Sequence, residues 1–149
     1  MVVSARMTNR HAALVLVALV SLVIAACGGA ASPPPQPVPT TLAGTAWRAV
    51  SVAGKSTVVG REPTIKFDTD RVTGSGGCNG FGGTYTFANG VLRFGEMPMT
   101  LMGCEDPVGS IETSFMQILT SVTSVSIDEG GQLLVEGAGG QVLFVPSTG

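Results

Sequence analysis

A glycine-dense stretch that contains one cysteine limits the fold more than any other part of this sequence. Residues 74–85 read GSGGCNGFGGTY, and so many glycines permit tight turns, a bulge or a close backbone approach. The stretch carries Cys78, whereas Cys104 lies directly before the one segment with a clear helical pattern. We interpret the two cysteines as a staple that joins a sheet to the start of that helix.

The first 26 residues have the pattern of a secretory signal peptide. Two arginines precede an apolar run at 12–23, which is too short to span a bilayer comfortably. The run is followed by IAAC at 24–27, which resembles the bacterial lipobox, where the cysteine is acylated and becomes residue one. We therefore predict a lipoprotein that carries lipid of the palmitate type on Cys27. The alternative is an ordinary signal peptide that is cleaved nearby.

The rest of the chain divides into a tether and one domain. Residues 27–41 are rich in Pro, Gly and Ser, a composition that cannot form a core but makes an extended, semi-stiff linker. Residues 42–149 have the length of one domain. We expect this domain on the extracytoplasmic side of the cell membrane or the outer membrane, held there by the lipid.

The charge of the mature chain argues against nucleic acid as a partner. All ten acidic residues follow Cys27, but only six of the eight basic ones do, so the net charge after processing is −4. No run of Lys or Arg is present. Contact with a bilayer would therefore depend on the acyl chains and not on charge.

Short segments with period-two alternation predict an antiparallel sheet. Trp47 and Ala49, with Ser51 as a further candidate, would face the core from the first strand. Asn89-Gly90 is a strong hairpin signal between two of the segments. The expected strands are 47–52, 64–68, 71–74, 83–87, 91–94, 125–127, 132–136 and 142–145.

A single amphipathic helix is expected after Asp106-Pro107, which have the residue types of an N-cap and a first helical position. Its apolar face would hold Ile111, Phe115, Ile118, Leu119 and Val122, whereas Glu112 and Gln117 would lie off that face. The predicted fold class is α+β: a curved antiparallel sheet or an incomplete small β-barrel, capped by one helix.

Four motifs occur in order: LAGTAW at 42–47, GCN at 77–79, GTY at 83–85 and MTLMGC at 99–104. Together they resemble the META domain family, the HslJ-like bacterial lipoproteins. Gly103 departs from the alanine that is more usual in the last motif, which concerns packing and not chemistry. The resemblance implies an incomplete antiparallel barrel with one helix, envelope or stress-related roles, and no established enzymatic activity.

Cys78 and Cys104 could form a disulfide, a metal pair or a nucleophile with a bystander. An oxidising exported compartment favours the disulfide. Closing a loop of about 27 residues contributes roughly 3.5 kcal/mol in the chain-entropy model. We therefore predict a disulfide, with Cys27 acylated and outside the pairing.

Catalysis and cofactor binding are disfavoured. The one histidine, His11, lies in the predicted signal peptide, so the mature chain has no Ser-His or Cys-His pair and no histidine ligand. The acidic residues lie at turns and at a helix start. Acids are common at such positions because they bond to nearby backbone N–H groups and interact favourably with the helix dipole. The glycine stretch lacks the Gly-Lys-Ser/Thr ending of a phosphate-binding loop. The methionines at 97–102 are more typical of packing than of copper binding. We predict no cofactor and no metal.

The sequence therefore predicts a non-enzymatic, lipid-anchored envelope protein with an interaction or stress-related role. Its partner would be an unidentified envelope protein. The alternative is a binding module for an apolar or amphipathic small ligand in a partly open barrel. The candidate binding residues are Asn79, Tyr85 and Trp47, although core packing is the more ordinary role for such aromatics.

Overall fold

The structure is a computed structural model, and it describes residues 37–148. The predicted signal peptide, Cys27 and most of the predicted tether therefore lie outside the described residues. Within the described part, no helix combines the length and the apolar character that crossing a membrane requires.

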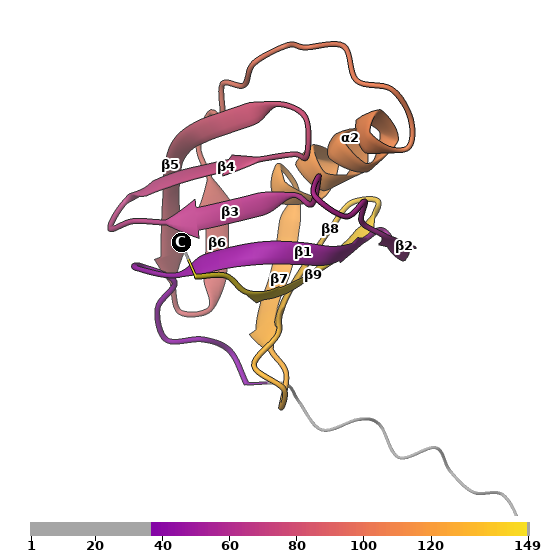
Figure 1. Cartoon of the computed structure of the whole chain (residues 1–149). Coiled ribbons are helices and arrows are strands. Elements are labelled where there is room, and N and C mark those ends of the chain that lie inside the picture. Colours follow the sequence, from indigo (N-terminus) through magenta and orange to yellow (C-terminus); the bar gives the residue numbers. More distant parts are fainter. Residues whose placement is uncertain (1–36, 149) are drawn as a thin grey trace, which may run out of the picture. The chain divides into compact units, whose positions relative to one another are not determined.

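The described domain is an antiparallel sheet that curls into a nearly closed barrel, with one helix beside it (Figure 1). The spatial order of the strands is β6-β5-β4-β3-β1-β9-β8-β7, and the short β2 pairs with β1. The two outer strands, β6 and β7, contact each other, which nearly closes the barrel. The predicted fold class is confirmed. The elements are β1 (Ala46–Val52), β2 (Lys55–Ser56), β3 (Thr64–Phe67), β4 (Arg71–Ser75), β5 (Gly80–Ala88), β6 (Val91–Phe94), α2 (Val108–Leu119), β7 (Val122–Ile127), β8 (Leu133–Gly137) and β9 (Gly140–Pro146).

Alternation along the strands places the core as predicted, with one exception in β1. Trp47 and Ala49 are buried, but the pairing of β1 with β9 shifts its register between Ala49 and Ser51. An extra residue in one strand reverses the faces that follow it. Val52 is therefore buried in place of Ser51, which is half-buried.

The glycine stretch contributes to two strands and the turn between them. β4 ends at Ser75 and β5 begins at Gly80, so the strands extend further into the stretch than the sequence predicted. Gly74 pairs with Phe81 across the ladder, and a Cβ on Gly74 would lie 2.6 Å from Cζ of that ring. Glycine at this position lets the Phe81 ring lie over β4 and reach the helix.

The helix packs its apolar face on β1, β8 and β9. Phe115 is fully buried, and its ring centroid lies 6.0 Å from those of Phe81 and Phe144. The helix begins at Val108, slightly later than predicted, and a carboxylate oxygen of Asp106 accepts a hydrogen bond from the backbone N–H of Ser110 at 3.0 Å. Asp106 therefore still satisfies one of the free N–H groups in the first turn.

The two ends of the barrel differ in what they carry. The β5–β6 hairpin turns at Asn89-Gly90, both with positive φ, as the sequence predicted. At this end the backbone N–H of Ile127 donates to the carbonyl of Pro37 at 2.8 Å. Figure 1 shows the loop between β6 and α2 arching over the opposite end, beside the helix.

Candidate functional site

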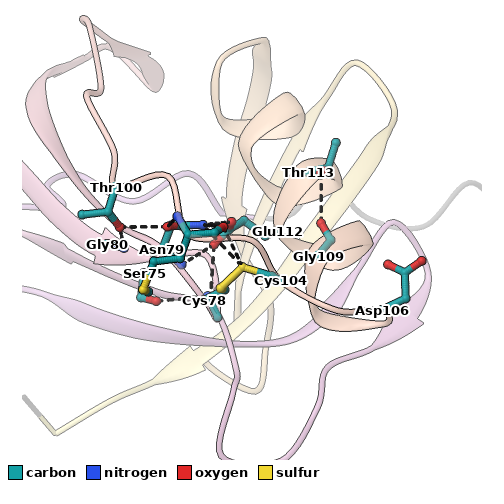
Figure 2. Close-up of a disulfide and its surroundings, with 12 residues drawn as sticks. Ser75, Cys78, Asn79, Gly80, Thr100, Cys104, Asp106, Gly109, Glu112 and Thr113 are labelled. Atoms are coloured by element: carbon teal, nitrogen blue, oxygen red, sulfur yellow. Dashed lines mark hydrogen bonds between the residues drawn. A yellow bond between two sulfur atoms is a disulfide. The ribbon is translucent and has the colours of Figure 1, made fainter.

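The candidate site is formed by the turn between β4 and β5, the loop before α2, and the first turns of that helix. Cys78 in the turn and Cys104 in the loop form a disulfide with a Cα–Cα distance of 6.3 Å, which is within the normal range (Figure 2). The predicted pairing is confirmed. The disulfide connects the sheet to the segment that leads into the helix.

Asn79 is the centre of the hydrogen bonds around this disulfide. Its side chain is 3% exposed, and its amide oxygen accepts from the backbone N–H of Met102 at 2.7 Å and from Thr100 Oγ1 at 2.9 Å. Its amide nitrogen donates to the Met102 carbonyl at 3.1 Å and to Glu112 Oε1 at 2.7 Å. Because a backbone N–H can only donate, the bond from Met102 fixes the orientation of the amide.

Glu112 accepts three of the hydrogen bonds that hold the turn. It is 7% exposed, although the sequence placed it off the buried face of the helix, and that prediction was wrong. Its Oε2 accepts from the backbone N–H groups of Asn79 at 2.6 Å and Cys78 at 3.3 Å. A Cβ on Gly76 would lie 2.5 Å from Oε2, so only glycine leaves room for the carboxylate there.

Backbone contacts fix the loop of residues 99–104 before and after Leu101, whose side chain is exposed. Met99 bridges to Phe81, the backbone N–H of Thr100 donates to the Gly80 carbonyl at 3.0 Å, and both backbone groups of Met102 bond to Asn79. Leu101, between these fixed residues, is 91% exposed. Met102 is 59% exposed. The backbone is therefore fixed while apolar side chains face solvent.

The other two predicted binding residues lie inside the barrel. Trp47 is buried, and its Nε1 donates to Thr45 Oγ1 at 2.8 Å. Tyr85 is buried, and its hydroxyl donates to the Asp68 carbonyl at 2.7 Å. Burial raises the pKa of Tyr85, with smaller contributions from the negative charges of Asp68 and Asp70. A ligand-binding role for Trp47, Tyr85 and Asn79 stays a prediction.

Sequence reasoning missed Glu112, although a signal was present. Val108, Glu112, Phe115 and Leu119 follow each other at intervals of four, three and four residues, which defines one face of a helix. An acid on that face, close to a cysteine, indicated a buried polar contact. Thr100 and Met102 were missed because both bond to Asn79, which lies more than 20 residues away in the sequence.

Three potential metal ligands also meet here. They are the sulfur atoms of Cys78 and Cys104 and a carboxylate oxygen of Glu112, and all three atoms lie within 4.8 Å of one another. Cys104 lines two surface hollows, of about 470 and 400 Å³. A further hollow of about 260 Å³ lies between β6 and the turn from α2 to β7, and it is below the usual size of a drug-sized ligand site.

The profile of the META domain family matches residues 40–149, which is most of the chain. The chain belongs to the META domain family. Its fold is similar to that of a protein from Burkholderia xenovorans solved by NMR, with 26% identity, a TM-score of 0.60 and coverage of 79% of this chain and 94% of that one. A second NMR structure has 25% identity and a TM-score of 0.57, over 69% of this chain and 89% of the other. None of the curated proteins compared with this chain matches it.

Family membership and the barrel fold agree with a small domain in which nothing indicates catalysis. Residues 37–148 contain no histidine, so no Ser-His or Cys-His pair occurs in the described part of this META domain. Glu112 is occupied by three N–H donors. The hydrogen bonds around Asn79 and Glu112 therefore hold the loop of residues 99–104 in place. The groups at this site that could react or bind are the disulfide and the exposed side chains of the loop.

Proposed function

We propose that this META domain protein is anchored in the cell envelope by acylated Cys27 and works by binding another envelope protein. The observation that carries the binding role is Leu101, which is 91% exposed at the centre of a loop whose flanking residues are fixed. The lipobox at residues 24–27 supports the anchor.

A fixed loop that exposes an apolar side chain suits recognition. Ordering a flexible loop upon binding costs about 0.5–1.5 kcal/mol for each immobilised side chain, and a loop that is already fixed avoids part of this cost. The disulfide and the Asn79 amide fix residues 99–104 before any partner arrives. A few side chains that become fully buried near the centre of an interface commonly contribute most of the binding free energy.

The charges around Leu101 indicate what kind of surface the loop fits. Glu96, Glu105 and Asp106 are exposed in the same loop, and residues 94–149 contain no Lys or Arg. A single basic residue, Arg61, lines the hollow beside Glu105 and Asp106. An anionic bilayer would repel such a loop. The complementary partner is a protein with an apolar pocket that is bordered by basic side chains.

The position of the loop is consistent with this role. Pro37, from which the chain continues towards Cys27, bonds to Ile127 at the hairpin end of the barrel. The loop that carries Leu101 lies at the opposite end (Figure 1). A partner that binds this loop would therefore contact the end of the barrel opposite to the one at which the described chain begins.

Site-specific photo-crosslinking in intact envelopes tests the binding role. A crosslinker at position 101 should give a discrete product with one protein, whereas the same group at Val59, which is 92% exposed, should not. With that protein purified, Leu101→Ser should weaken binding about thirtyfold, Val59→Ser should not, and salt should weaken the wild-type complex. Equal losses for both variants, or products with lipid alone, would refute the proposal.

The anchor has a separate test. Cells that express the wild-type chain should retain it in membranes with a lipid-modified Cys27, and Cys27→Ser should abolish both the modification and the retention. A stress-related role follows from the family resemblance alone. It predicts that cells lacking the protein grow more slowly under envelope-damaging agents, and that Leu101→Ser does not restore their growth.

A further inference from the structure

We propose that the reduced form of this protein binds one zinc ion between Cys78, Cys104 and Glu112. The disulfide occupies both sulfur atoms in the oxidised form. Its reduction leaves two thiols beside a buried carboxylate, with all three potential ligand atoms already within 4.8 Å of one another. Two thiolates and one carboxylate form a donor set that suits zinc.

The distances require little rearrangement. In a tetrahedral zinc site the Zn–S distance is about 2.3 Å and the Zn–O distance about 2.0–2.2 Å, so the ligand atoms lie about 3.3–3.8 Å apart. The sulfurs must separate after reduction, and a carboxylate oxygen must approach them by roughly 1 Å. The ligands come from a turn, a loop and a helix, and none of the three lies within a strand of the barrel.

The surrounding donors are arranged to support a negatively charged ligand set. Asn79 Nδ2 donates to Glu112 Oε1 at 2.7 Å and lies 3.5 Å from the Cys104 sulfur. The backbone N–H of Asn79 donates to Oε2 at 2.6 Å. Hydrogen bonds of this kind orient metal ligands, and removing them typically lowers metal affinity tenfold to a hundredfold.

An ion can reach the site from solvent. One hollow of about 470 Å³ is lined by Cys78, Cys104, Glu105 and Asp106 together with Arg61, so its two acids outnumber its one basic residue. A second hollow, of about 400 Å³, is lined by Cys104, Asp106 and Glu112. Both cysteines are only partly buried. The open side leaves room for a water molecule as a fourth ligand.

An external thiol can reduce the Cys78–Cys104 disulfide. Two external thiols transfer two electrons and two protons to the Cys78–Cys104 bond, which breaks into two thiols while the reductant becomes a disulfide. Zinc binding then releases the two cysteine protons, because thiolates are the ligands. The ion would thus restore the connection between turn and loop that reduction removes, and residues 99–104 would stay in place.

The test uses the full-length chain, purified in detergent and reduced with a phosphine that is then removed under nitrogen. Co²⁺ is the spectroscopic probe, and Zn²⁺ competes with a chromogenic chelator. The reduced protein should bind one Co²⁺ with a thiolate-to-metal charge-transfer band and tetrahedral ligand-field bands, and Zn²⁺ should displace it. The oxidised protein should show neither band.

Variants assign the ligands. Cys78→Ser and Cys104→Ser should each weaken the charge-transfer band strongly. Glu112→Gln should lower zinc affinity about tenfold or more, whereas Glu105→Gln, which removes an exposed acid nearby, should leave it unchanged. Circular dichroism reports whether each variant is folded. A reduced, folded wild type without the thiolate band would overturn the proposal, and so would a folded Glu112→Gln with wild-type affinity.

Discussion

Replacing Glu112 by glutamine tests whether the buried carboxylate holds the turn and the loop together. The carboxylate accepts three hydrogen bonds, two from backbone N–H groups and one from Asn79 Nδ2. Glutamine has the same shape but only one acceptor oxygen. If that oxygen faces the two backbone donors, the new NH₂ group faces the NH₂ of Asn79, and two donors meet in a buried site.

The expected loss of stability follows from these contacts. A hydrogen bond to a charged group contributes about 1.5–3 kcal/mol, and leaving a buried donor without a partner costs about 1–3 kcal/mol. The two remaining bonds persist but become weaker because the acceptor is neutral. We expect Glu112→Gln to lower the free energy of unfolding by about 2–4 kcal/mol in total. At roughly 4 °C per kcal/mol for a domain of this size, the melting temperature should fall by about 8–16 °C.

Urea denaturation with the disulfide intact measures this loss, followed by tryptophan fluorescence from Trp47, which is buried in the core. Glu105→Gln is the matched control, because it removes the same charge from an exposed position in the adjacent loop. The control should change stability by less than about 0.5 kcal/mol. The slope against urea should stay the same in both variants.

A second substitution identifies the contact responsible. Asn79→Asp replaces the donor to Glu112 by an oxygen and should also destabilise the domain. In the double variant, the amide of residue 112 can donate to the carboxylate of residue 79, so the combined loss should be smaller than the sum by about 1–3 kcal/mol. Strictly additive losses would refute the direct pairing of these two side chains, and an unchanged Glu112→Gln would refute the structural role itself.

Three further predictions concern the same domain. Gly76→Ala should cost about 1–3 kcal/mol because its Cβ would lie 2.5 Å from Glu112 Oε2, whereas Gly103→Ala, which has open space around it, should be neutral in the same urea assay. Cys104→Ser should lower the free energy of unfolding by about 3.5 kcal/mol relative to the oxidised wild type, and equal stability would contradict the staple. The raised pKa of Tyr85 means that the unfolded chain loses its tyrosine proton first, so stability should fall as pH rises above about 10. Tyr85→Phe should flatten this fall in a pH series, at a cost of about 1 kcal/mol at neutral pH for the bond to the Asp68 carbonyl.

The sequence was informative wherever neighbouring residues decide the structure. Alternation placed Trp47 and Ala49 in the core, and Asn89-Gly90 specified the hairpin, because both effects depend on residues within one strand or turn. The two cysteines also pointed to the correct pairing, since the only other cysteine, Cys27, lies in the segment that we predict to be acylated. Four motifs in order identified the family.

Other features depended on contacts between distant segments. The burial of Val52 in place of Ser51 results from a register shift against β9, which no pattern within β1 could reveal. Glu112 is buried because the turn at residues 76–79 presents N–H donors to it and Gly76 leaves it room. An acid on a helix face is costly in the interior unless such donors are supplied.

The sequence by itself determined the class of the fold and most of its strands, and it favoured a disulfide between Cys78 and Cys104, since periodicity, turn residues and cysteine count carry that information locally. It did not predict β2, and it assigned Val122 to the helix although this residue begins β7. Only the tertiary structure brought Asn79, Glu112 and the loop at 99–104 together, and left Leu101 exposed between fixed neighbours. The physical reason is that hydrogen-bond partners more than 20 residues apart are selected by how the barrel and the helix pack, and residue spacing does not encode that packing.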